Sequence, residues 1–93
     1  MKITIKVAAL IINKKDEVLL IKEKYGAGDE PKWNLVKGTF DNFNETLSEC
    51  VIREIKEEVG IKAKSPVLKE IFHYGDKDNQ RILFIFETIC NAS

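Results

Sequence analysis

The sequence has few of the features that mark secreted, membrane-spanning or nucleic-acid-binding proteins. Its 93 residues hold two cysteines, Cys50 and Cys90, which form neither a disulfide framework nor a metal-ligand spacing. The apolar run Val7–Ile12 is too short to span a membrane and lacks the flanks of a signal peptide. Fifteen basic residues balance fifteen acidic ones, which gives no general attraction to nucleic-acid polymers or membranes. We therefore expect a cytoplasmic globular protein with both cysteines buried.

The length and composition bound the chain to one small domain, residues 1–93. The pattern of β-branched and apolar residues predicts five strands, at Ile3–Ile12, Glu17–Lys24, Trp33–Val36, Val67–Tyr74 and Arg81–Ile89. Turn-forming residues predict a loop over Tyr25–Pro31 and a hairpin around Gly75–Asn79. The last predicted strand is apolar on both of its faces, so both faces need cover.

One helix is expected between the third and fourth predicted strands. Thr46 and Glu49 have the spacing of a capping box at its start. Gly60 suits the left-handed turn that ends a helix. Apolar residues recur at spacing four at Val51, Ile55 and Val59, and this stripe predicts packing against a sheet or another helix.

The same predicted helix carries three glutamates on one edge. Glu54, Glu57 and Glu58 stand at i, i+3 and i+4, so their carboxylates converge. Acidic helix faces are usually solvated, and Arg53 could pair with Glu57 or with Glu49. Like charges that are partly desolvated favour a bound cation, and oxygen ligands suit Mg²⁺ or Mn²⁺. The position of the trio beside the apolar stripe favours the metal site.

These residues belong to a longer pattern. The segment Arg53–Ile61 (REIKEEVGI), with Glu45 eight residues before Arg53 and Gly38 upstream, resembles the box of the Nudix hydrolase family, G-x5-E-x7-R-E-U-x-E-E-x-G-U with U a bulky aliphatic residue. Two features depart from it. The six residues Thr39–Asn44 stand where the pattern has five, and Val36-Lys37 replaces the Pro and Gly that many members have before the box glycine.

The resemblance implies roles for these residues. Glu54 would help to activate water, and Arg53 would orient the carboxylates through a charge-assisted hydrogen bond with Glu45. Gly38 would offer its backbone to the metal. The implied set is catalytic Arg53, Glu54 and Glu57, metal-binding Gly38, Glu54, Glu57 and Glu58, and structural Glu45 and Gly60.

The implied activity is Mg²⁺-dependent hydrolysis of the diphosphate linkage in a nucleoside diphosphate linked to another moiety, with a small-molecule nucleotide as substrate. The identity of that moiety stays open. The alternative is a non-catalytic Nudix-like module that binds a nucleotide or a protein. The lengthened loop and Lys37 favour the module, whereas the intact glutamate pairs oppose it, because a pure binder has no need to hold like charges together.

The implied fold is α/β (α+β), a Nudix-like α/β/α sandwich with a mixed sheet. Because the sequence stops at Ser93, we expect the C-terminal strand and helix portion to be lacking and one sheet face to be bare. We favour a fragment of a longer chain over the alternative, in which a homodimer covers that face.

Outside the box, Lys22 and Lys24 follow the apolar run of the second predicted strand. The resemblance makes them candidates for contacts with substrate phosphates, and an ordinary edge position is the alternative. We expect Trp33 to pack in the core rather than to stack on a base, and Phe43 to pack under the helix rather than to contact substrate. For His73 and Tyr74 we expect structural roles rather than contact with a nucleobase. Glu87 is a candidate for an additional acid.

Overall fold

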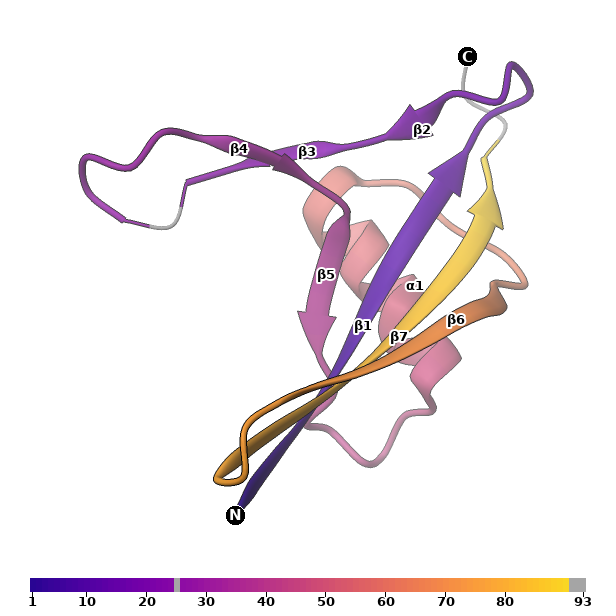
Figure 1. Cartoon of the computed structure of the whole chain (residues 1–93). Coiled ribbons are helices and arrows are strands. Elements are labelled where there is room, and N and C mark those ends of the chain that lie inside the picture. The colour runs from indigo at the N-terminus through magenta and orange to yellow at the C-terminus, as the bar shows by residue number, and fades with distance from the viewer. Residues whose placement is uncertain (25, 91–93) are drawn as a thin grey trace.

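The computed structural model describes residues 1–24 and 26–90, which form a mixed sheet with one helix against it (Figure 1). The central strand is β1 (Lys2–Ile12), which pairs in parallel with β7 (Asn79–Ile89) along its whole length. The antiparallel strand β6 (Val67–Gly75) lies beyond β7 and forms one edge of the sheet. The predicted first, fourth and fifth strands are therefore confirmed.

The second and third predicted strands each divide into two. β2 (Val18–Leu19) and β5 (Val36–Thr39) pair with β1, whereas β3 (Ile21–Glu23) and β4 (Lys32–Asn34) pair with each other. β3 and β4 form a ribbon that projects from the body of the molecule (Figure 1). Each segment serves two sheets and changes direction at one residue between them, which an apolar pattern alone does not reveal. The Tyr25 end of the predicted loop lies outside the described residues.

Helix α1 (Leu47–Val59) has both predicted caps. The Thr46 hydroxyl accepts the Glu49 N–H at 3.1 Å, and the Glu49 carboxylate accepts the Thr46 N–H at 2.8 Å. Gly60 has φ 72°, and its N–H donates to the Lys56 carbonyl at 3.0 Å. The helix packs on one face of the sheet, where the buried core consists of Val7, Ala9, Ile11, Val36, Cys50, Val51, Ile55, Ala63 and Phe86.

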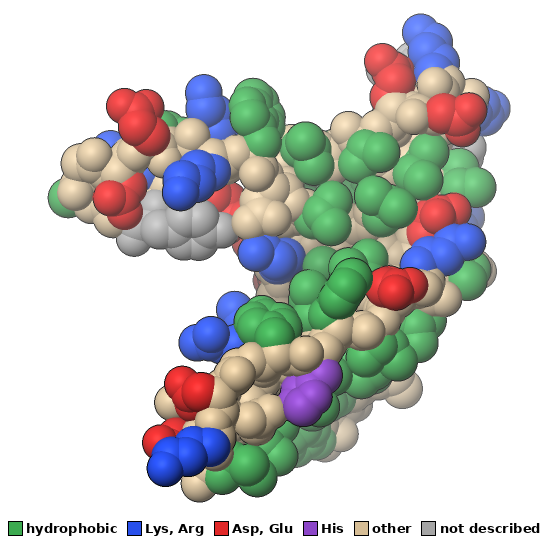
Figure 2. Space-filling view, viewed as in Figure 1, with side chains coloured by type: hydrophobic (Ala, Val, Ile, Leu, Met, Phe, Trp, Pro, Cys, Tyr) green, Lys and Arg blue, Asp and Glu red, His purple; other side chains and the backbone are tan. Residues whose placement is uncertain are grey.

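The opposite face of the sheet has no helix on it among the described residues. Side chains alternate along a strand, so Leu10 and Ile12 of β1 and Leu83 and Ile85 of β7 point away from α1. Figure 2, which looks at the side opposite α1, shows hydrophobic side chains gathered on this face. Every residue of β6 is exposed. We call the sheet surface that carries Leu10, Ile12, Leu83 and Ile85 the open face. The expectation of a mixed α+β sheet with one bare face is thus confirmed, and the second helix layer of a sandwich is not formed by the described part of the chain.

The prediction that Trp33 packs in the core is wrong, and Phe43 packs at the surface. Trp33 is 64% exposed because it lies on the projecting ribbon, away from the core. Phe43 is 78% exposed; its ring contacts Phe40, with the centroids 5.3 Å apart, at the surface of the loop before α1. Of the two cysteines, Cys50 is buried as predicted and Cys90 is only half-buried, and both are thiols rather than halves of a disulfide.

Candidate functional site

The guanidinium of Arg53 lies among three carboxylates. It forms a bidentate contact with Glu45, in which Nη2 donates to Oε1 at 2.8 Å and Nε donates to Oε2 at 3.2 Å. Nη1 donates to Glu54 Oε1 at 3.1 Å and to Glu57 Oε2 at 3.2 Å. The alternative partner, Glu49, instead caps the helix. The pairing of Arg53 with Glu45 is therefore as the resemblance implied.

The electrostatics of this cluster place Glu54 apart from the other acids. Its side chain is only 14% exposed. Burial raises the pKa of Glu54, the negative charges of Glu57 and Glu58 act in the same direction, and Arg53 opposes them. The hydrogen bond from Arg53 lowers the pKa of Glu45, and the same bond raises the pKa of Arg53. Glu54 is thus a partly desolvated carboxylate that shares one guanidinium with two other acids, a setting that favours another cation.

Gly38 lies directly beneath the Glu54 side chain. A Cβ atom built on Gly38 would be 2.3 Å from Glu54 Cδ and 2.6 Å from Oε1. Such distances are far inside van der Waals contact, so the carboxyl group occupies the space of the missing side chain. Glycine at this position lets the backbone of β5 approach the acid.

The extra residue between Gly38 and Glu45 does not displace the box glycine. Gly38 is held in β5 opposite Val7, and the strand continues to a hydrogen bond from the Phe40 N–H to the Ile5 carbonyl at 2.8 Å. The added length falls in the turn that follows, where the Asn42 carbonyl accepts the Glu45 N–H at 3.3 Å. Backbone and carboxylate therefore come together despite the longer loop.

Val36 and Lys37, the other departures from the box pattern, lie on opposite sides of β5. Val36 is fully buried in the core under α1. Lys37 pairs with Ala8 and points to the open face by strand alternation. Neither side chain therefore enters the Arg53 cluster.

The residues fit a hard divalent cation by chemistry rather than by ready-made geometry. Among residues 1–24 and 26–90, no three acidic, histidine or cysteine side chains are already grouped as metal ligands. The oxygens of Glu54 and Glu57 turn toward Arg53 instead. Glu57 and Glu58 are exposed and can rotate, and carboxylate and backbone oxygens are the ligands that Mg²⁺ prefers. The set Gly38, Glu54, Glu57 and Glu58 is suited to Mg²⁺ or Mn²⁺.

The candidates outside the box lie apart from this cluster. Lys22 has its Nζ 5.4 Å from the centroid of the Trp33 ring on the projecting ribbon, and Lys24 follows β3 as an exposed side chain. Glu87 pairs with Lys69 at 3.7 Å and points to the open face. The structure therefore puts Glu87 on the other side of the sheet from α1.

Two features escaped the sequence reasoning. Glu23 has a buried carboxylate oxygen with no hydrogen-bond partner among the described residues, and its position between two lysines was the signal available. The Cys50 thiol lies 3.8 Å from Arg53 Nη2 and donates to the Thr39 carbonyl at 3.9 Å. Burial raises the pKa of Cys50 to about 11. The thiol is thus a neutral support beneath Arg53.

Comparisons with known proteins identify the family of the chain. The NUDIX domain matches residues 2–92, and the chain belongs to the NUDIX family. The chain is 35% identical over 85 residues to an ADP-ribose pyrophosphatase of Methanocaldococcus jannaschii, an alignment that covers 85% of this chain and 48% of the relative. The chain therefore spans about half the length of that relative.

Solved structures share the fold. A MutT protein from Methanosarcina mazei Go1 superposes with a TM-score of 0.78 at 29% identity, over 99% of this chain and 67% of that one. The NUDIX domain of Shewanella oneidensis NrtR, solved in complex with ADP-ribose, gives a TM-score of 0.75 at 16% identity, over 100% of this chain and 63% of that one. At that identity the second likeness concerns the fold alone. No helix in the described part of the chain is long and apolar enough to cross a membrane.

Proposed function

We propose that this chain is a Mg²⁺-dependent pyrophosphohydrolase that cleaves the diphosphate linkage of a nucleoside diphosphate linked to another moiety. The observation that carries the proposal is the packing of the Glu54 carboxyl against the Gly38 backbone within the Arg53 cluster. Membership of the family and the name of the 35%-identical relative support the same class of reaction. ADP-ribose is accordingly the first substrate to test.

Gly38, Glu54, Glu57 and Glu58 would hold the cation. When bound, Mg²⁺ neutralises phosphate oxygens and lowers the pKa of a bound water, and Mn²⁺ could replace it. The protein's own part is mostly positioning and charge stabilisation.

Glu54 is the proton acceptor in this proposal. Its raised pKa makes it a stronger base than an exposed glutamate, and we assign it the proton of the attacking water. The water oxygen forms a bond to one phosphorus as the bridging P–O bond breaks. The products are a nucleoside monophosphate and the phosphorylated second moiety.

Arg53 acts as a positioning residue in this scheme. Its bidentate contact with Glu45 fixes the guanidinium, so that Nη1 faces Glu54 and Glu57. A planar group held at two points keeps its orientation better than a lysine ammonium would. We expect Arg53 to set the direction of both carboxylates without touching substrate.

The test is release of nucleoside monophosphate from ADP-ribose and a panel of nucleotides, with Mg²⁺ or with EDTA. A phosphatase-coupled readout detects monophosphates, and a pyrophosphatase-coupled readout detects pyrophosphate. We expect metal-dependent release, a loss of about 100-fold or more in Glu54→Gln and in Glu57→Gln, and little loss of stability. Glu30→Gln, in an exposed loop, is the matched control. Turnover like that of the wild type in Glu57→Gln would refute its assignment as a ligand.

A non-catalytic module that binds a nucleotide or a protein is the second candidate. The observation that favours this module is that the chain spans about half the length of its relative from Methanocaldococcus jannaschii. Metal-independent binding of nucleotide, with no product from any member of the panel, would support the module over the enzyme.

A further inference from the structure

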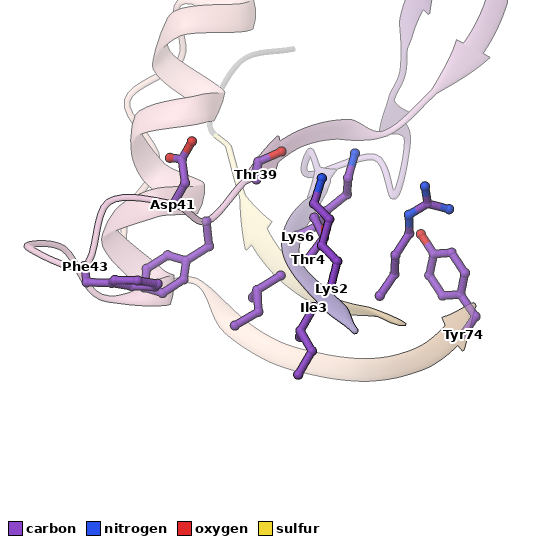
Figure 3. Close-up of a pocket in the computed structure, with 11 residues that line it drawn as sticks. Lys2, Ile3, Thr4, Lys6, Thr39, Asp41, Phe43 and Tyr74 are labelled. Carbon is purple, nitrogen blue, oxygen red and sulfur yellow. The ribbon is translucent and has the colours of Figure 1, made fainter. Parts of the chain in front are cut away.

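A groove of about 680 Å³ lies along the N-terminal half of β1, apart from the Arg53 cluster (Figure 3). β5 stops pairing with β1 at Lys6, and the Phe40 N–H then donates to the Ile5 carbonyl at 2.8 Å. Among the described residues, no strand pairs with β1 on this side before Ile5. The groove therefore lies at a free edge of the sheet.

The backbone of Ile3 supplies the hydrogen-bonding groups of this edge. The N–H and carbonyl groups of successive residues point alternately to the two sides of a strand. The Lys2 N–H donates to the Asp78 carbonyl on the β7 side at 2.7 Å, whereas the Ile5 carbonyl faces β5. Ile3 therefore directs both its N–H and its carbonyl to the free edge. Such groups form a template for pairing with another extended chain.

One wall of the groove is apolar. Ile3 and Ile5 point to the side of the sheet that carries α1, because side chains alternate along β1 and Val7 lies in the core. On this side Phe40 packs against the core and contacts the ring of Phe43. Ile3 and Phe43 are both largely exposed. This wall can therefore accept an apolar side chain from a second chain.

The other wall is cationic and consists of Lys2, Lys6 and Arg81. Lys2 and Lys6 extend in the same direction, toward the side of the open face (Figure 3). Arg81 lies on the same side, because it is opposite Thr4 in the pairing of β7 with β1. No salt bridge joins any of the three to a described carboxylate. Of the described residues that line the groove, only Asp41 is acidic, so the wall keeps a net positive charge.

An extended peptide that continues the line of β5 would pair with β1 at Ile3. The peptide residue opposite Ile3 exchanges both backbone hydrogen bonds and directs its side chain to the apolar wall. The residues before and after it lie opposite Lys2 and Thr4, with their side chains on the cationic side at about 5 Å between Cβ atoms. The sequence pattern that fits the groove is therefore acidic–apolar–acidic.

Charge selects among the chains that could pair at this edge. Lysines on an edge strand discourage pairing with neutral or basic strands. A second copy of the same edge would bring Lys2 and Lys6 close to like charges of its partner, which is unfavourable. An acidic strand instead brings opposite charges to the cationic wall.

We propose that the free edge of β1 docks an extended segment of a partner protein in which acidic and apolar side chains alternate. The backbone of Ile3 provides the pairing, and the two walls provide the selectivity. The surface lies apart from the Arg53 cluster, so docking and hydrolysis can be measured independently.

The selectivity is tested with a labelled peptide in which glutamate and valine alternate, titrated in EDTA and followed by fluorescence anisotropy. We expect the wild type to bind this peptide and not the matched peptide with lysine in place of glutamate. The Lys2→Gln/Lys6→Gln variant should bind about tenfold more weakly, because two ion pairs are lost. Lys14→Gln/Lys15→Gln, which removes the same charge from an exposed turn, should match the wild type. Absence of binding by the wild type, equal binding of the two peptides, or an unchanged affinity in Lys2→Gln/Lys6→Gln would overturn the proposal.

The backbone pairing is tested at Ile3. Ile3→Pro removes the N–H at the free edge and leaves the hydrogen bonds between β1 and β7 in place, since these use the neighbouring residues. We expect a loss of about tenfold or more in peptide affinity, whereas Ile3→Val, which keeps the N–H, should bind like the wild type. Thermal unfolding verifies that both variants are folded. Full affinity in a folded Ile3→Pro variant would refute docking by strand pairing.

Amide hydrogen exchange in the wild type tests the same pairing without a substitution. The peptide should slow exchange of the Ile3 amide and leave the amides of β6, at the other edge of the sheet, unchanged. Slower exchange along β6 in place of Ile3 would contradict the assigned edge. Self-association that protects Ile3 in the absence of peptide would show a second copy as the occupant and would also contradict the proposal.

Discussion

The two faces of the sheet share the same strands but differ in what their side chains do. On the face under α1, Ile11 and Phe86 are buried in a continuous core, and the box residues surround Arg53 at its edge. On the open face, Phe72 is 48% exposed and Lys69 pairs loosely with Glu87 at 3.7 Å. The covered face holds both the core and the candidate chemistry, because burial and a fixed helix are what orient Glu54.

This difference also bears on how the site tolerates change. A residue on the covered face is held by neighbours from the helix and the sheet, so its substitution disturbs both. A residue on the open face has neighbours only within the sheet. Substitutions at adjacent residues of one strand therefore compare the two faces directly, because adjacent side chains point to opposite faces.

The largest expected effect comes from the pair Ile11→Ala and Ile12→Ala on β1. Ile11 is fully buried, so the Ile11→Ala substitution should lower the free energy of unfolding by about 2–5 kcal/mol. Ile12 is half-buried, so the Ile12→Ala substitution should lower it by about 1 kcal/mol or less. Urea unfolding of both variants measures the difference. Equal losses of unfolding free energy in the two variants, increasing with protein concentration, would mean that a second copy of the chain covers the open face. The two faces would then be equally buried in solution.

A second pair, Gly38→Ala and Lys37→Ala on β5, tests the chemistry rather than the core. The new methyl group at position 38 overlaps the Glu54 carboxyl and forces it to move, so we expect a loss of about 100-fold in turnover. Lys37 points to the open face and should change turnover by less than about threefold. Metal-dependent hydrolysis is the readout, and circular dichroism verifies that both variants are folded. A Gly38→Ala variant with full activity would remove Glu54 from its assigned place.

The smallest expected effect is on the pH dependence of stability. The pKa of Glu45 is lowered by Arg53, so its contribution is present above its ordinary pKa of 4.5 and is lost as the pH falls through the folded-state value. The pKa of Glu54 is raised, so its contribution is present below 4.5 and is lost as the pH rises through its folded-state value.

Replacing Glu45 by Gln should therefore reduce the loss of stability as the pH falls. Replacing Glu54 by Gln should reduce the loss of stability as the pH rises. Lys69→Gln, which breaks the pair on the open face, should leave both limbs of the profile in place. Thermal midpoints measured from pH 3 to 7 show these changes. A Glu45→Gln profile that matches the wild type would contradict the assigned role of the Arg53–Glu45 contact.

Much of the covered face could be predicted from the sequence. Local patterns determine the helix, because the Thr46–Glu49 box and the Gly60 turn satisfy backbone groups within a few residues. The pairing of Arg53 with Glu57 follows from helical spacing, and the pairing with Glu45 was implied by the family pattern. These contacts lie close together along the chain or are repeated in a known motif.

Other features depend on contacts between distant segments. Trp33 has the composition of a core residue but is exposed, because β4 pairs with β3 away from the sheet. Lys2, Lys6 and Arg81 carry no shared pattern in the sequence, and the parallel pairing of β1 with β7 brings them to one groove. The sequence alone determined the helix, its caps and the glutamates on its edge, since these depend on spacing within a few turns. Only the tertiary structure decided which strand faces are covered and which cations meet, because strand pairing joins residues nearly eighty positions apart.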